Sequence, residues 1–294
     1  FRRILISQGL DLSFKQNSYS GYSYTLAKEG ESSKMDSDSF FVRKFQDIDA
    51  AGVARKATEK ALSRLNAKQL KTGHYAVVID REVVPQLFAM MDGYFSAQEV
   101  FEGKSLFQGK LNQKIAGENL TVLDDPFDER GPSLRPFDSE GAPSQKTVLI
   151  EKGVLKNFLT NLEYAKKMNL PHTAHAARSP ASPMGISTSN LVFAKGEKSL
   201  QQLLAKYDKV VHLTSLTGGL HAGFKESSGD FSLPAEGFLY ENGKNTGPID
   251  QFVMSGNVMG LLAGIDELGN EYNKEGNSTI APDVLIKSLS FAGA

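Results

Sequence analysis

Turn sequences that join adjacent strands recur along the chain and restrict its fold most strongly. Glu241-Asn242-Gly243-Lys244 separates the strand-like residues 237–240 from a segment that leads to 252–254. Asn-Gly is the strongest short hairpin signal, because both residues tolerate the positive φ that a tight hairpin turn requires. Glu151-Lys152-Gly153 separates two further strand-like runs, and residues 1–47 alternate polar and apolar side chains. We therefore predict an α+β fold with a predominantly antiparallel sheet.

Helical spacing begins at residue 51, where Val53, Ala57 and Leu65 recur on one face and Asp49 is placed to cap the helix. Residues 124–144 are rich in Asp, Pro, Gly and Ser, which is typical of a loop. We predict further helices over residues 83–101, 159–168, 200–207 and 258–268, a buried strand over 75–79 and a final strand over 284–291.

The chain length of 294 residues corresponds to one or two domains. We assign residues 1–50 to the β-rich end of an N-terminal region or to connecting strands, expected as a meander. Residues 51–294 are assigned to an α+β domain in which helices pack on the antiparallel sheet. The chain begins without Met, directly in a strand-like run, so we expect that part of an N-terminal region precedes it.

The charge balance argues against nucleic acid as a partner, because 33 Lys and Arg oppose 34 Asp and Glu and leave a formal net charge of −1. The absence of Cys excludes disulfides, thiolate nucleophiles and metal sites with a Cys ligand. No apolar run reaches the roughly 20 residues that a membrane span needs, and the first residues are too short for a signal sequence. We expect a soluble, cytoplasmic protein.

His172 and His175 are close enough in sequence to serve a metal. They lie in a polar loop without an acidic third ligand nearby in the sequence, so we favour a loop pair with solvent or backbone partners. Met90 and Met91 could form an adaptable peptide-binding face, but core packing is the better interpretation.

Acidic residues gather in the predicted loop and could bind a hard cation such as Ca²⁺. Their spacing lacks the D-x-D-x-D-G pattern of a calcium loop, so we favour roles in turns and caps. The group consists of Asp124, Asp125, Asp128, Glu129, Asp138 and Glu140.

Two short glycine-bearing segments, Thr217-Gly218-Gly219-Leu220 and Gly229-Asp230-Phe231-Ser232, could present backbone N–H groups to an anion or carboxylate. Tight turns are the alternative. The chain has neither a dinucleotide nor a P-loop glycine pattern, and no G-x-S-x-G context around a serine. Nucleotide binding and a serine nucleophile therefore have no support.

An ordered series of segments covers nearly the whole chain and resembles the TldD/PmbA family, long labelled modulators of DNA gyrase and understood as peptidases. The series comprises Gly103-Lys104-Ser105, Gly109-Lys110-Leu111, Asp124-Asp125-Pro126, Phe137-Asp138-Ser139-Glu140-Gly141, Glu151-Lys152-Gly153, the run 229–238, Glu241-Asn242-Gly243, Ser255-Gly256-Asn257 and Gly269-Asn270. The resemblance implies a further N-terminal domain ahead of residue 1.

The proteolytic subunit of that family resembles a zincin, with H-E-x-x-x-H on a helix just before the Gly-Lys-Ser segment and a distant Cys. The matching residues 86–99 of this chain contain no His, and the chain contains no Cys. We therefore assign no catalytic residue and no metal ligand to this chain. The departure matches the PmbA/TldE branch, whose members pair with a TldD-like homologue that supplies the zinc.

The resemblance also places the two glycine-bearing segments along a cleft for substrate or partner. The cleft residues it implies are Gly218, Gly219, Gly229, Asp230, Ser232, Glu236 and Asn257. We expect a metal-free subunit of a metalloprotease acting on small unfolded peptides, with no cofactor of its own. The alternative is a non-enzymatic regulatory protein of the gyrase-modulator type, with a homodimer of the isolated chain left open.

Overall fold

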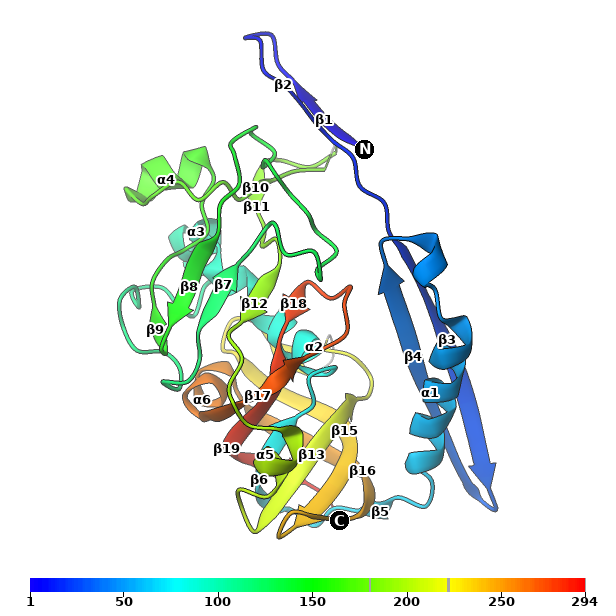
Figure 1. The fold of residues 1–294 in the computed structure, drawn as a ribbon. Helices are drawn as coiled ribbons and strands as arrows, with labels where there is room; N and C mark the ends of the chain where they lie inside the picture. Colours follow the sequence, from blue (N-terminus) through cyan, green and yellow to red (C-terminus); the bar gives the residue numbers. More distant parts are fainter. Residues whose placement is uncertain (180, 221–222, 294) are drawn as a thin grey trace.

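The computed structural model describes residues 1–179, 181–220 and 223–293. It has an α+β fold in which most strand pairs are antiparallel, as predicted (Figure 1). The main sheet consists of β5 (Lys68–Gln69), β6 (Gly73–Ile79), β13 (Lys209–Leu216), β14 (Phe224–Lys225), β15 (Asp230–Glu241), β16 (Lys244–Asn257), β17 (Ile265–Tyr272) and β19 (Pro282–Ala292). The β13–β6 and β16–β5 pairs are its parallel exceptions in the described part.

Five strands of the main sheet are paired in a ring. β15 pairs with β13, β13 with β6, β6 with β19, β19 with β16, and β16 returns to β15. Residues of β6 and β19 such as Val77, Ile79 and Ile286 are fully buried. The ring therefore forms the buried centre of the main sheet.

A second sheet and several helices cover this ring. The second sheet has the order β18 (Thr279–Ile280), β12 (Leu191–Phe193), β7 (Val122–Asp124), β8 (Thr147–Glu151) and β9 (Val154–Leu155). The helical elements are α2 (Val84–Phe88), the 3₁₀ helix η2 (Ala89–Phe95), α3 (Ala97–Phe101), α4 (Leu162–Met168), α5 (Leu200–Leu204) and α6 (Val258–Ala263). No helix of the described residues combines the length and apolar character needed to cross a membrane.

The N-terminal elements form separate hairpins beside this body (Figure 1). β1 (Arg2–Leu5) pairs with β2 (Asp11–Phe14), and β3 (Tyr19–Glu29) pairs with β4 (Ser32–Val42). The 3₁₀ helix η1 (Phe45–Asp47) precedes α1 (Ala50–Ser63), which contacts both β3 and β4. The predicted meander is thus wrong, because the extended chain between Phe14 and Tyr19 carries no pairing from one hairpin to the next among the described residues.

Ion pairs attach the β3–β4 hairpin to the main sheet. The Nζ of Lys34 lies 2.8 Å from Glu236 and 2.7 Å from Asp250, and Arg64 after α1 lies 3.2 Å from Glu236. All four side chains are at least three-quarters buried. Partial burial reduces solvent screening of these pairs but also costs desolvation of each charge.

Most predicted elements are confirmed. The side chain of Asp49 accepts a hydrogen bond from the N–H of Gly52 and caps α1. The Asn-Gly turn joins β15 to β16, with positive φ at Asn242 (49°) and Gly243 (74°). The hairpin around Gly153 joins β8 to β9, and the strands predicted at 75–79 and 284–291 are β6 and β19.

Two predicted helices are wrong in part. The helix expected over 83–101 is divided into α2, η2 and α3, because the segment tightens to 3₁₀ geometry and Ser96 adopts an extended backbone. The helix expected over 258–268 ends at Gly264, since Ile265 and Leu268 pair with β19. Residues 86–99 therefore do not form one continuous helix.

The close approach of β15 to β13 leads to a stability prediction. A Cβ on Gly237 would lie 2.1 Å from the carbonyl oxygen of His212. The backbone of β13 cannot move aside without disturbing the sheet. Gly237→Ala should therefore lower the free energy of unfolding by roughly 2–4 kcal/mol in urea titrations. Gly260→Ala on α6, where nothing lies within 4 Å, is the matched control and should be neutral or slightly stabilising. Equal stabilities of the two variants would contradict the register.

Candidate functional site

An open pocket of about 680 Å³ lies beside the divided helical segment. η2, α3 and the turn that follows form one side, β11 (Gly185–Ile186) another, and the turn between β14 and β15 a third. The lining residues are Gly93, Ser96, Gln98, Glu99, Gly103, Lys104, Gly185, Ile186, Glu226 and Ser227. We call this pocket the cleft. The cleft places residues 93–99 beside the turn that leads to Gly229.

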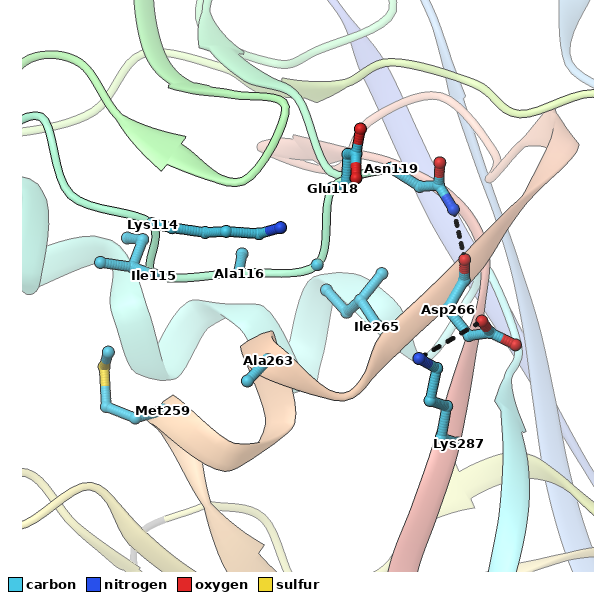
Figure 2. A pocket seen from close by; sticks show the side chains of 11 residues that line it. Lys114, Ile115, Ala116, Glu118, Asn119, Met259, Ala263, Ile265, Asp266 and Lys287 are labelled. Atoms are coloured by element: carbon cyan, nitrogen blue, oxygen red, sulfur yellow. Dashed lines mark hydrogen bonds and ion pairs between the residues drawn. The ribbon is translucent and has the colours of Figure 1, made fainter.

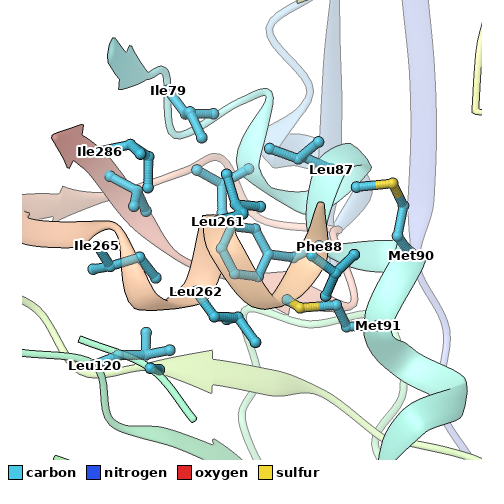
Figure 3. Packing of buried hydrophobic residues seen from close by; sticks show 14 of the residues in the cluster. Ile79, Leu87, Phe88, Met90, Met91, Leu120, Leu261, Leu262, Ile265 and Ile286 are labelled. Atoms are coloured by element: carbon cyan, nitrogen blue, oxygen red, sulfur yellow. The ribbon is translucent and has the colours of Figure 1, made fainter. Parts of the chain in front are cut away.

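Apolar packing holds the helical side of the cleft. Phe88, Met90 and Met91 are at most 6% exposed and pack among residues such as Leu261 and Leu262 (Figure 3). The prediction that the two methionines belong to the core is confirmed. The hydroxyl of Tyr94 donates to the carbonyl of Glu226 at 2.6 Å, which ties η2 to the turn after β14.

Negative charge predominates in the cleft. The Nζ of Lys104 is 2.6 Å from the Glu102 carboxylate, whereas Glu99 and Glu226 have no cation within 4.0 Å in the part of the chain that the structure describes. Burial, aided by Glu226, raises the pKa of Tyr94 to about 12. The cleft therefore offers carboxylate oxygens and no positive charge free of an acidic partner among its described lining residues.

Asp92 on η2 lies behind this surface. Burial raises the pKa of its carboxyl to about 7, with a smaller contribution from the negative charge of Asp124. One of its oxygens, Oδ1, is buried without a hydrogen-bond partner among the described residues. Asp92 is thus an acid that changes protonation near neutral pH.

The helical segment does not fit a zinc ion. Residues 86–99 offer no imidazole and no thiolate, and the chain has no Cys elsewhere. Among the described residues, groups with metal-ligand chemistry occur away from this segment, at Asp80, His212 and Asp283 and at Asp138, Glu140 and His172. In the first group, His212 Nε2 is 3.1 Å from Asp80, so both side chains are already paired.

The histidine loop differs from its prediction in one respect. Acidic partners missing from the local sequence come from distant segments: His175 Nε2 lies 2.9 Å from Asp124, and His172 Nε2 lies 3.8 Å from Glu140. His175 is also 2.9 Å from the hydroxyl of Thr173 and is almost fully buried. The two histidines therefore face different carboxylates.

Four of the acidic residues serve turns and caps, as predicted, whereas Asp124 at the end of β7 is bound to His175 and Ser189. Asp138 accepts hydrogen bonds from the N–H groups of Glu140, Ala142 and Ala176. Glu140 accepts from the N–H of Leu162 at the start of α4. Asp125 and Asp128 each accept from the N–H two residues later. These carboxylates are occupied by backbone donors.

Four of the predicted cleft residues lie together where β15 begins and β16 ends. Asp230 is opposite Asn257 and accepts a hydrogen bond from its side chain at 2.8 Å, and Ser232 is opposite Ser255. Gly229 precedes Asp230 with a φ of 75°. They adjoin the cleft through Glu226 and Ser227 but do not line it.

The other three predicted residues lie elsewhere. Gly218 and Gly219, with φ of 84° and 70°, follow β13 in the loop toward β14. Glu236 is bound to Lys34 and Arg64 at the contact with the N-terminal hairpin. Sequence reasoning did not assign Glu99 and Glu226 to the cleft. A signal was present for both, because Glu99 ends the segment 86–99 that was compared with the zinc-binding helix and Glu226 stands three residues before Gly229.

A second open pocket, of about 650 Å³, lies between α6 with the start of β17 and the segment 114–119 (Figure 2). Lys114 and Glu118 are on one side of it, and Asp266 and Lys287 are on the other. Asp266 is 2.7 Å from Lys206 and accepts a hydrogen bond from Tyr207. The partly buried Asp266 is therefore already paired, whereas Lys114 and Glu118 have no side-chain partner among the described residues.

Comparison with known proteins connects the chain to a family. Residues 72–293 match the PmbA/TldA metallopeptidase C-terminal domain, and residues 1–65 match the central domain of the same family. A Buchnera aphidicola metalloprotease PmbA homologue is 26% identical over 98% of this chain, which spans 62% of that protein.

Solved structures agree. A proposed modulator of a DNA gyrase from Thermotoga maritima superposes with a TM-score of 0.91 and 31% identity over 97% of this chain and 65% of its own. TldE from Thermococcus kodakarensis gives a TM-score of 0.90 and 26% identity over 99% of this chain and 66% of its own. The chain belongs to the PmbA/TldD/TldE family of metallopeptidase-like proteins. It spans about two thirds of the length of these relatives.

The raised pKa of Asp92 predicts a pH dependence of stability. A carboxyl whose pKa is about 7 when folded and near 4 when unfolded binds more protons in the folded state between these values. Its contribution to stability is therefore lost as pH rises from about 4 to about 7, by an amount on the order of 4 kcal/mol. Asp92→Asn should remove this fall in urea titrations at pH 5 and pH 8.

Asp47→Asn, at an exposed acid on η1, is the control and should leave the pH profile of the parent protein unchanged. A carboxyl ¹³C titration gives the pKa of Asp92 directly. A midpoint below pH 5 would show that the carboxyl is hydrated and that its burial is not as described.

Proposed function

We propose that this chain is the metal-free subunit of a metalloprotease that acts on small unfolded peptides in the cytoplasm, with zinc supplied by a TldD-like homologue. One observation carries the proposal. Residues 86–99, which the family resemblance aligns with the zinc-binding helix of a proteolytic subunit, border an open cleft but offer no imidazole or thiolate. The chain thus has a cleft at this segment without the ligands for a zinc ion.

Strand edges supply the means to hold a peptide. β14 pairs with β15 alone, and β11 pairs with β10 (Ala176–Ala177) alone, among the described residues. Gly185 and Ile186 of β11 line the cleft, and Glu226 and Ser227 directly follow β14. An extended peptide that adds to such an edge is bound through its main chain, so many sequences are accepted.

The side chains of the cleft offer no ligand set for a catalytic zinc. A bound zinc would activate water and stabilise the oxyanion, and the proposal assigns that role to the homologue. Glu99, Glu226 and Asp92 are therefore assigned to shaping and charging the cleft. The acidic surroundings favour peptides that carry positive charge.

A regulatory role without hydrolysis is the second candidate, because the Thermotoga maritima relative is named for modulation of a DNA gyrase. In that case a homodimer of this chain is the expected form. The net charge of −1 gives it no general attraction for DNA, so the contact would be with protein.

Reconstitution separates the two candidates. The isolated chain should show no chelator-sensitive cleavage of an unstructured peptide, because it lacks the ligands for a catalytic metal. An equimolar mixture with a TldD-like homologue should cleave the peptide, and a chelator should abolish the activity. Loss of the zinc-activated water removes several kcal/mol of transition-state stabilisation, so cleavage should fall at least about 10³-fold.

The partner alone and a mixture with a partner whose motif glutamate is replaced by Gln are the controls. Chelator-sensitive cleavage by the isolated chain, reduced by His172→Ala or His175→Ala, would move the active site to that loop. Failure of the two proteins to co-purify or to act together would favour the regulatory role.

Main-chain recognition predicts a specific pattern of peptide affinity. Methylating the amide nitrogens on one edge of a bound extended peptide removes its hydrogen bonds to the strand, and binding to the reconstituted complex should weaken by at least about tenfold. Methylation of the alternate set of nitrogens, and scrambling of the sequence at constant charge, should have little effect. Fluorescence anisotropy measures all three peptides. Equal affinities for both methylated sets would exclude binding by strand addition.

A further inference from the structure

A separate open pocket of about 340 Å³ lies between the β1–β2 hairpin and the loops after β7 and β11. Its polar side chains are two guanidinium groups, one amide and three hydroxyls, and its described lining contains no carboxylate. The lining residues are Phe1, Arg2, Phe14, Gln16, Ser133, Leu134, Arg135, Ser187 and Thr188. This composition is the opposite of the acidic cleft.

Arg135 is the buried charge of this pocket. It is 9% exposed, and its Nε is buried without a hydrogen-bond partner among the described residues. Its two terminal nitrogens donate long bonds of 3.4 and 3.5 Å to the hydroxyl and the carbonyl of Ser187. Burying a guanidinium removes its hydration, and only hydrogen bonds and an opposite charge offset that loss of free energy. Arg135 has few of its N–H groups bonded, so its burial is costly.

The second guanidinium adds to the positive charge. Arg2 donates to the carbonyl of Phe137 and to the hydroxyl of Ser139, which are neutral acceptors. Burial lowers the pKa of Arg135, and the charge of Arg2 lowers it further. The two arginines thus repel each other across the pocket.

Nearby acids do not neutralise the pair directly. Within the described ranges, no carboxylate lies within 4.0 Å of Arg135 or Arg2. Asp124 and Asp138 act on Arg135 from farther away. Asp124 is bound to Ser189 and His175, and Asp138 accepts from backbone N–H groups. A counter-charge at close range is missing.

We propose that this pocket is a binding site for an oxyanion, either a carboxylate or a phosphate, held between Arg135 and Arg2. The planar fork of a guanidinium matches two oxygens of either group and discriminates against halide ions. The hydroxyls of Ser133, Ser187 and Thr188 are available as further donors.

The position of the pocket suggests where such an oxyanion comes from. Ser187 and Thr188 directly follow Gly185 and Ile186, which line the cleft. A peptide with a free C-terminal carboxylate and inorganic phosphate are the two sources of the same chemistry. The site itself stands on the arginines and does not depend on the proposed proteolytic role.

Isothermal titration of the purified protein tests the site. Sodium phosphate at constant ionic strength, a short acetylated peptide acid and the corresponding peptide amide are the probes, with sodium chloride as the blank. Saturable binding of phosphate or of the peptide acid is expected, and the amide should bind at least about tenfold more weakly than the acid if the peptide is the source. Binding of phosphate alone identifies a free anion as the source.

Arg135→Met and Arg2→Met should each weaken binding by at least about tenfold, whereas Arg55→Met on the exposed face of α1 should not change it. Arg135→Met removes an unpaired buried charge, so its melting temperature without ligand should be unchanged or higher. If that variant fails to fold, Arg2→Met decides. Absence of saturable binding up to roughly 10 mM of both oxyanions, or undiminished binding by the folded arginine variants, would overturn the proposal.

Discussion

The segment from Val84 to Phe95 is buried against the ring of strands, and this packing positions the cleft. Leu87 and Phe88 are almost fully buried, and Phe88 meets Phe193 of the second sheet edge-to-face at 5.0 Å between ring centroids. Each such side chain contributes on the order of 2–3 kcal/mol when removed from water. The packing fixes η2 beside the turn after β14, and the cleft between them follows from it.

The same packing accounts for the polar character of the cleft. With its apolar side chains facing inward, η2 directs Gly93 and the neighbouring Ser96 toward the opening, and Asp92 is left behind the surface with a raised pKa. Charge is distributed unevenly over the molecule. The cleft presents Glu99 and Glu226, whereas the pocket at β1–β2 presents Arg2 and Arg135. A near-neutral chain thus carries two sites of opposite sign.

Local signals predicted the parts of the fold that depend on local chemistry. The hairpin at Asn242-Gly243 and the cap at Asp49 follow from residue types that favour these local conformations over most others. Long-range contacts could not be predicted in this way: the pairing of Glu236 with Lys34, 202 positions away, has no local signal. The apolar run 83–101 also gave no sign of a 3₁₀ helix at residues 89–95, because hydrophobic periodicity over so short a segment does not separate 3₁₀ from α-helical geometry. Ser187 gave no signal because its partner, Arg135, is 52 residues away.

We propose that residues 86–99 of this chain border a peptide cleft without holding a catalytic metal. Anomalous diffraction at the zinc edge can decide this, with crystals of this protein in complex with a TldD-like homologue. We expect a zinc peak on the H-E-x-x-x-H helix of the homologue and none within bonding distance of residues 86–99. A zinc peak coordinated by side chains of that segment would contradict it.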